Sequence, residues 1–398
     1  MALKLYILDD DEQYAALLTE VASNIGWDVT AEKNPVSFLQ SNILQGSVLV
    51  LDLNMPEMDG IEVIRALAEK RINLLLILVS GFDARVLHSA QQLAEAHHFK
   101  VLASLTKPMS IQEFAKTLNS IKPQSEQIQK LSLTENMVSA AGLEQAIHQH
   151  QLVLHYQPQI NMKKEDLHGV EALVRWQHPE HGLIYPNQFI GLAEKSGLIE
   201  PLTEEVIRLA VEQSRHWQAD GININISINV SAENITSLSL PEQLKELTDK
   251  HEIEPNKITL EITENAVMGD LTSSLDVLNR LRMKGFALSI DDFGTGYSSL
   301  SHLYKMPFTE LKIDQNFIMQ MLEDSEAMVI VKICIMLGQM LGMKLVAEGV
   351  ETRDVWKELQ TLGCDIAQGY LIAKPMPADT LIQWINRNKQ SGIKNEYY

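Results

Sequence analysis

The sequence predicts an α/β protein of two domains: a doubly wound, five-stranded parallel domain, followed by an irregular (β/α)8 barrel with an antiparallel first strand. Three observations support this fold class. The 398 residues exceed the length of one ordinary domain. Short apolar runs alternate with helical patterns along the whole chain, which favours parallel sheets covered by helices. Eight such runs follow residue 138, and eight β/α units in about 250 residues are typical of a barrel.

The first domain is predicted over residues 1–122. Its five strand-like runs lie at residues 3–8, 27–30, 48–51, 74–79 and 101–105, and the second of them is the weakest. An open parallel sheet brings the carboxyl ends of neighbouring strands to one crevice. The following segment, residues 123–137, is rich in Gln, Ser and Lys, so we expect a linker there.

The second domain is predicted over residues 138–398. Its strand-like runs lie at residues 152–156, 169–174, 224–229, 257–262, 286–290, 310–313, 344–347 and 366–371. Helical patterns separate most of them. The first gap, residues 159–168, is too short for a crossover helix, so the first two strands should form an antiparallel hairpin.

The composition of the chain argues against several classes of protein. The net charge of −19 disfavours a DNA-binding surface, which needs clustered Lys and Arg. An anionic substrate stays possible, because carboxylates can recruit a divalent metal that supplies positive charge. No run is long enough for a membrane span, no signal peptide is expected, and two cysteines suggest no disulfide scaffold. We therefore expect a cytoplasmic protein.

Polar side chains follow the strands of the first domain. Asp9 and Asp10 follow the first strand, Asp52 the third, Ser80 the fourth and Lys107 the fifth. Three carboxylates in one crevice would suit Mg²⁺, and a lysine and a hydroxyl suit a phosphoryl group on one carboxylate. Taken alone, the acidic pair could equally cap a strand and start a helix.

This pattern resembles the receiver domain of two-component response regulators over about residues 1–120. The resemblance implies that a cognate histidine kinase phosphorylates Asp52. The residues that it places around Mg²⁺ and the phosphoryl group are Asp9, Asp10, Asn54, Ser80 and Lys107. Ser104 departs from the family, which often has an aromatic switch residue at this position.

A second set of polar residues lies at the ends of the barrel runs. Its members are Glu171, Asn229, Glu261, Asp291, Asp292, Lys312, Glu348, Glu351 and Gln368. In a β/α barrel such positions face one catalytic mouth, where unpaired charges are costly. Two divalent ions about 4 Å apart would neutralise the carboxylates and assist attack of water on a phosphodiester. Between two metals, Lys312 should have a lowered pKa that lets it help to deprotonate or orient the water.

These motifs, with Glu-Ala-Leu at 171–173, resemble the EAL family of cyclic di-GMP phosphodiesterases over about residues 138–390. The resemblance implies hydrolysis of cyclic di-GMP to linear pGpG with two Mg²⁺ or Mn²⁺ ions. The implied metal ligands are Glu171, Asn229, Glu261, Asp291, Asp292 and Glu348. The implied substrate contacts are Gln157, Leu173, Arg175, Asp292, Glu351 and Gln368. The implied catalytic residues are Lys312, Glu171, Glu348 and Glu264, the last of which holds the Asp-Asp-Phe-Gly loop.

Three alternative functions compete with this interpretation. A non-catalytic cyclic di-GMP receptor or scaffold would be favoured by missing metal ligands, but every expected ligand is present. A glycosidase needs two principal carboxylates rather than five with an asparagine and a lysine. A DNA-binding regulator would need a stripe of basic residues, and this sequence shows none. By resemblance, we also expect a homo-oligomer, a dimer or a larger assembly.

Overall fold

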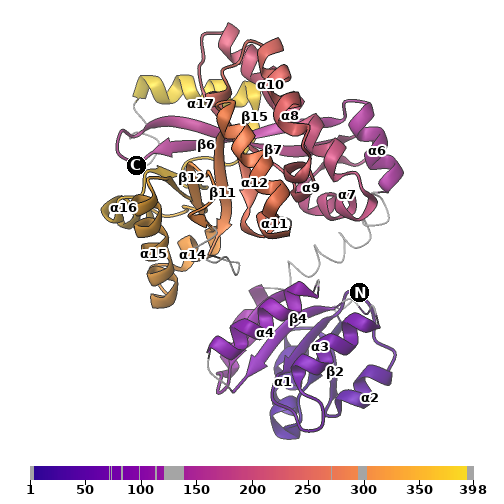
Figure 1. Cartoon of the computed structure of the whole chain (residues 1–398). Helices are drawn as coiled ribbons and strands as arrows, with labels where there is room; N and C mark the ends of the chain where they lie inside the picture. Colours follow the sequence, from indigo (N-terminus) through magenta and orange to yellow (C-terminus); the bar gives the residue numbers. More distant parts are fainter. Residues whose placement is uncertain are drawn as a thin grey trace. The chain divides into compact units, whose positions relative to one another are not determined.

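The structure, a computed structural model, describes residues 4–70, 72, 74–81, 84–97, 99–112, 114–120, 139–269, 271–294 and 303–391. The chain divides into two compact units, residues 1–137 and 138–398 (Figure 1). The predicted linker, residues 123–137, lies outside the described residues. Among the described helices, none combines the length and apolar character that crossing a membrane requires.

The first unit contains a parallel sheet of five strands, as predicted, and the structure arranges them in the order β2-β1-β3-β4-β5. The strands are β1 (Lys4–Leu8), β2 (Asp28–Glu32), β3 (Val48–Asp52), β4 (Leu75–Ser80) and β5 (Lys100–Thr106). Central strands β3 and β4 are buried throughout, which explains their continuous apolar runs. Edge strand β2 is largely exposed, and its apolar signal is correspondingly weak.

Helices cover both faces of this sheet (Figure 1). They are α1 (Glu12–Asn24), α2 (Pro35–Gln40), α3 (Gly60–Glu69) and α4 (Ala84–Ala96). Alternate residues of β1 serve the two cores: Leu8 packs on one face and Ile7 on the other. The side chain of Asp11 accepts hydrogen bonds from two backbone amides and fixes the start of α1 directly after β1.

The second unit is an eight-stranded barrel, as predicted. Its strands are β6 (Leu152–Asn161), β7 (Asp166–His178), β9 (Asn225–Asn229), β10 (Ile258–Thr263), β11 (Ala287–Phe293), β12 (Glu310–Ile313), β13 (Lys344–Ala347) and β14 (Ile366–Ala367). Strand β6 runs antiparallel to both of its barrel neighbours, β7 and β14, and closes the barrel. The predicted run 366–371 is a strand only over its first two residues.

Two short strands outside the barrel were not predicted. Strand β8 (Gly182–Ile184) pairs with the end of β7, and β15 (Met376–Pro377) pairs with β6. Both continue the sheet beyond its closed part.

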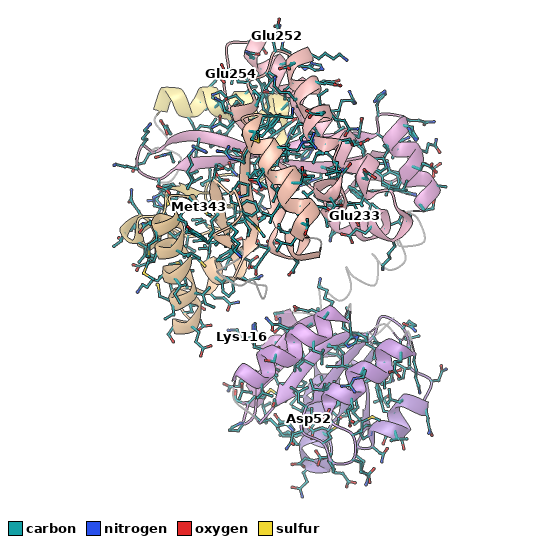
Figure 2. All side chains as sticks on the ribbon, in the orientation of Figure 1. Asp52, Lys116, Glu233, Glu252, Glu254 and Met343 are labelled. Carbon is teal, nitrogen blue, oxygen red and sulfur yellow. The ribbon has the colours of Figure 1, made fainter. Side chains whose placement is uncertain are left out.

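Helices surround the barrel (Figure 1). They are α6 (Ala140–His148), α7 (Ile190–Ser196), α8 (Ile199–Ala219), α9 (Ala232–Thr236), α10 (Leu240–Lys250), α11 (Glu264–Gly269), α12 (Leu271–Met283), α14 (Gln315–Gln320), α15 (Ser325–Leu341), α16 (Arg353–Leu362) and α17 (Ala378–Ser391), with 3-10 turns η1 (Pro186–Gln188) and η2 (Pro255–Lys257). The apolar faces of most of these helices pack with the strands into one large core, and α6 and α7 contribute to a second, smaller core. Acidic side chains such as Glu233, Glu252 and Glu254 are exposed (Figure 2).

Candidate active site

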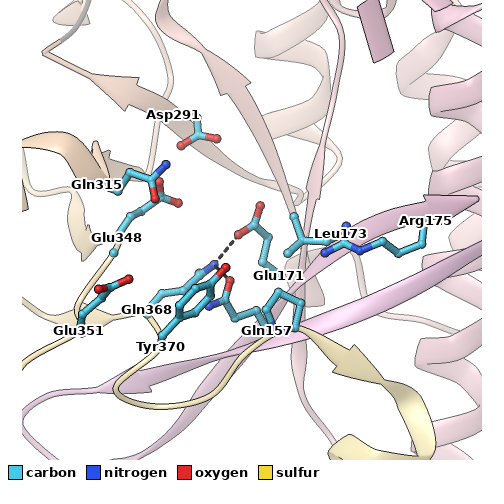
Figure 3. Close-up of a pocket in the computed structure, with 13 residues that line it drawn as sticks. Gln157, Glu171, Leu173, Arg175, Asp291, Gln315, Glu348, Glu351, Gln368 and Tyr370 are labelled. Carbon is cyan, nitrogen blue, oxygen red and sulfur yellow. Dashed lines mark hydrogen bonds between the residues drawn. The ribbon is translucent and has the colours of Figure 1, made fainter. Parts of the chain in front are cut away.

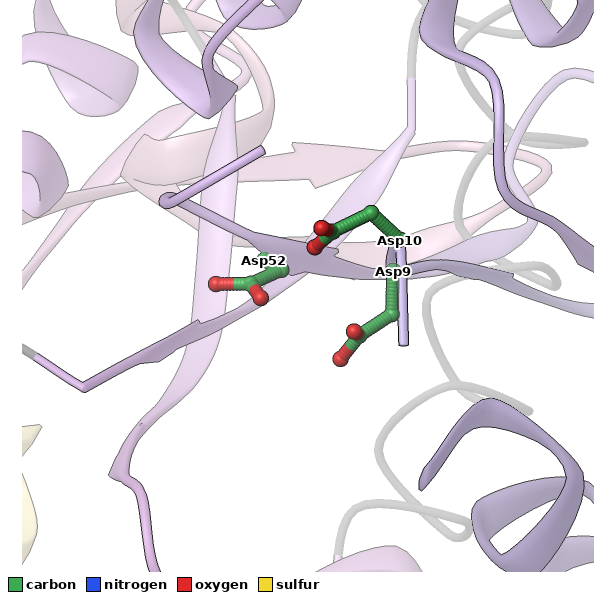
Figure 4. A group of neighbouring side chains, drawn as sticks. All are labelled: Asp9, Asp10 and Asp52. Carbon is green, nitrogen blue, oxygen red and sulfur yellow. The ribbon is translucent and has the colours of Figure 1, made fainter. Parts of the chain in front are cut away.

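The first unit holds an acidic cluster at the carboxyl ends of its strands. Asp9, Asp10 and Asp52 each offer a carboxylate oxygen within 4.8 Å of the others (Figure 4). The ammonium group of Lys107 donates hydrogen bonds to Asp9 Oδ2 at 2.7 Å and to Asp52 Oδ2 at 2.5 Å. Burial raises the pKa of Asp9, and Lys107 offsets part of that rise. The structure thus brings together the predicted carboxylates and lysine.

Local backbone contacts hold this acidic cluster in place. Asp52 is the last residue of β3, and its Oδ1 accepts a hydrogen bond from the backbone amide of Asn54. A Cβ atom on Gly60 would lie 2.7 Å from the Asp52 carbonyl oxygen, so only glycine allows α3 to begin this close. Ser80 is buried at the end of β4, and its carbonyl accepts a hydrogen bond from the Lys107 amide.

Lys312 occupies the centre of a second acidic site, in the barrel. Its side chain is 1% exposed. Its Nζ lies 2.6 Å from Glu348, 2.8 Å from Glu261, 3.1 Å from Asp291 and 3.9 Å from Glu171. These residues come from strands β7, β10, β11 and β12 and from the position directly after β13.

The lowered pKa of Lys312 is predicted for a lysine between two metal ions and stays a prediction, whereas the surrounding carboxylates alone act in the opposite direction. Burial opposes the charged form, but the fields of Asp291, Glu171, Glu261 and Glu348 outweigh it and raise the pKa of Lys312 well above its ordinary value. The expectation assumed that metal charges would dominate. Without them, the surrounding carboxylates decide the protonation of the lysine.

The carboxylates of this site outnumber the lysine. Asp291, Asp292 and Glu348 offer oxygens within 4.8 Å of one another. Burial, reinforced by Asp291 and Glu171, raises the pKa of Glu348 to about 8, although Lys312 opposes the shift. Burial and the neighbouring Asp291 raise the pKa of Asp292 to about 6. Such an all-oxygen set with excess negative charge fits a divalent cation.

Two further observations agree with a cation site. The Oε1 atom of Glu261 is buried and has no hydrogen-bond partner among the described residues, a position that is costly unless a ligand occupies it. Asn229, at the exposed end of β9, donates a hydrogen bond to Glu171 Oε1 at 2.8 Å. All six predicted metal ligands therefore lie at this mouth.

A chain of glutamine side chains lies beside Glu171. Gln368 Nε2 donates to Gln157 Oε1 at 3.0 Å and to Glu171 Oε2, and Gln159 Nε2 donates to Gln368 Oε1 at 3.0 Å. Gln157 in turn donates to the carbonyl of Ala373. Gln159 was not predicted. Its position two residues after Gln157 on the same strand is the signal that could have identified it.

Glu264 contacts the loop after β11 and is not among the residues that line the cavity described below. Strand β11 has an irregular register near its end, where Asp292 has a φ of 53° and Gly294 a φ of 103°. The buried Glu264 carboxylate accepts a hydrogen bond from the Gly294 amide at 3.3 Å. This contact is consistent with the predicted loop-holding role. Residues 295–302 of the loop lie outside the described residues.

A cavity of about 340 Å³ opens over the acidic site (Figure 3). Its size lies within the range of small-molecule sites. The predicted substrate contacts that line it are Gln157, Leu173, Arg175, Glu351 and Gln368, together with Glu171, Asp291 and Glu348. Asp292, also predicted to contact substrate, belongs to the acidic cluster and is not among the lining residues.

Several lining residues were not predicted: Gln315, Gly349, Gly369, Tyr370 and Pro375. Gln315 follows β12 by two residues, so the strand-end rule that found the carboxylates would also have found it. A Cβ on Gly369 would lie 2.2 Å from the carbonyl oxygen of Val350, which explains the glycine after Gln368.

Comparisons with known proteins agree with this architecture. A family model described as the response regulator receiver domain matches residues 5–119, and one described as the EAL domain matches residues 140–375. The cyclic di-GMP phosphodiesterase RocR of Pseudomonas aeruginosa is 30% identical over 337 residues, which cover 85% of this chain and 86% of RocR.

A second relative matches the barrel alone. The bifunctional diguanylate cyclase/cyclic di-GMP phosphodiesterase MucR of Pseudomonas aeruginosa is 45% identical over 241 residues, which cover 60% of this chain and 35% of MucR. The solved structure of the MucR phosphodiesterase in complex with c-di-GMP aligns with a TM-score of 0.58 at 45% identity, covering 61% of this chain and 98% of that one. This chain thus spans about a third of the length of MucR. It belongs to the EAL domain family and carries a response regulator receiver domain before its EAL domain.

Proposed function

We propose that this protein is a response regulator that hydrolyses cyclic di-GMP to linear pGpG. The observation that carries the proposal is the set of four carboxylates around one buried lysine beneath a cavity of about 340 Å³. Relatives with this domain, RocR and MucR, are named as cyclic di-GMP phosphodiesterases. The complete set of polar strand-end residues favours catalysis over a receptor that only binds the dinucleotide.

The proposed cofactors are two Mg²⁺ or Mn²⁺ ions. The residues proposed to hold them are Glu171, Asn229, Glu261, Asp291, Asp292 and Glu348. When bound, such ions supply an activated water and positive charge at the phosphate. The oxygen-rich donor set suits these hard cations, and availability would decide between them.

Lys312 is proposed to orient the attacking water. Three carboxylates within 3.1 Å fix its Nζ in position. Its raised pKa keeps the ammonium protonated, so in the chain alone it serves as a hydrogen-bond donor rather than as a base. Glu264 is proposed to support this geometry indirectly, through its contact with the Gly294 amide.

The cavity lining offers complementary contacts for a guanine dinucleotide. Arg175 is the one cation among the described lining residues, and its planar guanidinium suits a phosphodiester. Glu351 supplies a carboxylate that can accept hydrogen bonds from the N–H groups of guanine. Gln157 and Gln368 supply amides, and Leu173 supplies apolar surface.

The decisive experiment is chromatography of cyclic di-GMP after incubation with purified protein and Mg²⁺, with Glu171→Ala beside it. We expect pGpG from the wild type and none from the variant. Circular dichroism checks that the variant is folded. A wild type that binds cyclic di-GMP but produces no pGpG, with or without phosphorylation of its receiver, would instead indicate a receptor.

Regulation is proposed to act through Asp52. The receiver is assigned to residues 1–122 and the linker to residues 123–137, and a cognate histidine kinase is the proposed phosphoryl donor. Support comes from the pairing of Asp52 with Lys107 inside the acidic cluster. Incubation with acetyl phosphate and Mg²⁺ should add the mass of one phosphoryl group to the wild type and not to Asp52→Asn. Equal labelling of both proteins would reject this site.

A further inference from the structure

Arg175 is buried at the cavity with few partners of its own. Its side chain lies among the buried polar residues, its Nε has no hydrogen-bond partner among the described residues, and one terminal nitrogen donates to the Val174 carbonyl at 2.8 Å. Within the described ranges it forms no ion pair. Its remaining donors are therefore available to a ligand in the cavity that it lines.

This isolation is unexpected beside so many carboxylates. Glu171 precedes Arg175 by four residues on β7, so both side chains lie on the same face of the strand. An ion pair between them would remove both a proposed metal ligand and a proposed phosphate donor. Figure 3 shows the two side chains apart, with Leu173 beside Arg175 and with Glu348 and Glu351 on the other side of Glu171. A contact on the side of Arg175 away from Glu171 is needed to hold the guanidinium in this extended position.

Tyr185 supplies that contact. The guanidinium carbon of Arg175 lies 5.2 Å from the centre of the Tyr185 ring, within the distance of a cation–π interaction. The unpredicted strand β8 explains why the ring is there. Trp176 pairs with Ile184 in the antiparallel β7–β8 ladder. Arg175 directly precedes Trp176, and Tyr185 directly follows the end of β8, so the two residues are neighbours.

The backbone around Tyr185 is also fixed. Its amide donates a hydrogen bond to Gln188 Oε1 at 3.1 Å, and Pro186 begins η1 directly after it. Yet the residue is 52% exposed, so burial of an apolar ring does not explain a tyrosine here. The ring is outside the cavity lining, whereas the guanidinium that it contacts is part of it.

We propose that Tyr185 is a positioning residue that holds the Arg175 guanidinium in the cavity, away from Glu171, ready for a phosphodiester oxygen of the dinucleotide. The inference rests on the proposed function, because it assigns to Arg175 a contact with that substrate. Tyr185 acts through Arg175 and does not touch the reacting atoms. A contact made equally before and during the reaction affects KM rather than kcat.

The test is a steady-state comparison of Tyr185→Leu, Tyr185→Phe, Arg175→Met and the double variant Tyr185→Leu/Arg175→Met. Tyr304→Leu is the matched control, since Tyr304 is an exposed tyrosine of the same unit outside the cavity lining. We expect KM for cyclic di-GMP to rise roughly 3- to 10-fold in Tyr185→Leu with kcat within about twofold. Tyr185→Phe, which keeps the ring, should retain the wild-type KM.

The double variant decides whether Tyr185 acts through Arg175. In the Arg175→Met background, Tyr185→Leu should have no further effect, because coupled residues do not add. An equal rise in KM with and without Arg175 would show that Tyr185 binds substrate directly and would overturn the proposal. So would an unchanged KM in Tyr185→Leu or in Arg175→Met.

A binding measurement separates this proposal from the proposed function. The dissociation constant of cyclic di-GMP, measured by calorimetry on the same proteins, should follow the pattern expected for KM. A wild type that binds but does not hydrolyse cyclic di-GMP would contradict the enzyme and leave the positioning role supported by the variant affinities. A wild type that neither binds nor hydrolyses it would reject both.

Discussion

The receiver and the barrel each place a lysine among carboxylates at the carboxyl ends of parallel strands, but they do so at different depths. In the receiver, Lys107 is 22% exposed and pairs with Asp9 and Asp52. In the barrel, Lys312 is 1% exposed and faces four carboxylates. The receiver site is therefore partly hydrated and has three carboxylates beside one lysine, whereas the barrel site is buried and has four carboxylates around its lysine.

The difference shows that a lysine and its neighbouring carboxylates suit different chemistry when they are partly hydrated and when they are buried. Water screens the charges of a shallow site, so a phosphoryl group can come and go there at modest electrostatic cost. A buried site with excess carboxylates is poorly compensated until cations or a ligand arrive. The receiver cluster suits reversible modification, and the barrel cavity suits metal-dependent chemistry on a small ligand.

Replacement of the buried lysine should have the largest effect. We expect Lys312→Met to lower the rate of cyclic di-GMP hydrolysis roughly 100- to 10,000-fold, the range for a group that positions or transfers a proton. Chromatographic quantification of pGpG measures it. Lys344→Met is the matched control, because Lys344 is exposed at the start of β13. Near-normal turnover in Lys312→Met would remove the lysine from the mechanism.

The two lysines should also differ in their contribution to stability. In metal-free protein, Lys312→Met should lower the free energy of unfolding of the barrel by about 3 kcal/mol, since it leaves buried carboxylates without a partner. Lys107→Met should cost the receiver only about 1–2 kcal/mol, because its site is partly hydrated. Urea denaturation with a probe in each unit compares them. Equal losses of unfolding free energy in the two variants would contradict the conclusion that the deeper burial of Lys312 makes it more important for stability.

Low pH should reduce the stability of the barrel through a histidine that lies outside the acidic site. Burial lowers the pKa of His168 to about 4, with Lys344 as the next contributor. In the unfolded state the pKa of His168 is near 6.5. Between about pH 4 and pH 6.5, His168 therefore binds more protons in the unfolded state than in the folded state. The contribution of His168 is therefore complete above about pH 6.5 and is lost as the pH falls towards about 4.

We expect this loss to reach about 1–2 kcal/mol, allowing for the partial exposure of the ring. His168→Gln should flatten the pH dependence of barrel unfolding in this window by that amount. The measurement is urea unfolding at a series of pH values for both proteins. Parallel curves for wild type and variant would assign the acid sensitivity to other groups.

The smallest effect is expected at the loop after β11. Glu264→Ala removes the acceptor of the Gly294 amide and should lower turnover about tenfold, the value of one lost hydrogen bond of about 1.4 kcal/mol. Glu264→Gln keeps a carbonyl acceptor and serves as the control. If Glu264→Ala matches the wild type in turnover, this hydrogen bond does not support the active loop.

Much of the fold follows from local patterns. The continuous apolar runs of β3 and β4 identified buried parallel strands, and the short gap at residues 159–168 required the antiparallel hairpin of β6 and β7. Strands β8 and β15 were missed because two or three residues carry too little periodicity to be detected. Their pairing depends on the strands already formed.

The candidate site likewise has features that local sequence predicts and features that depend on the folded chain. The carboxylates, amides and lysine that end the strands could be predicted from the sequence, because residue type and strand position are local properties. Two features could not be predicted and depend on the folded chain: four carboxylates surround Lys312 closely enough to raise its pKa, and the ring of Tyr185 contacts the guanidinium of Arg175. Electrostatic and packing interactions depend on distance and burial, which exist only after distant segments of the chain come together.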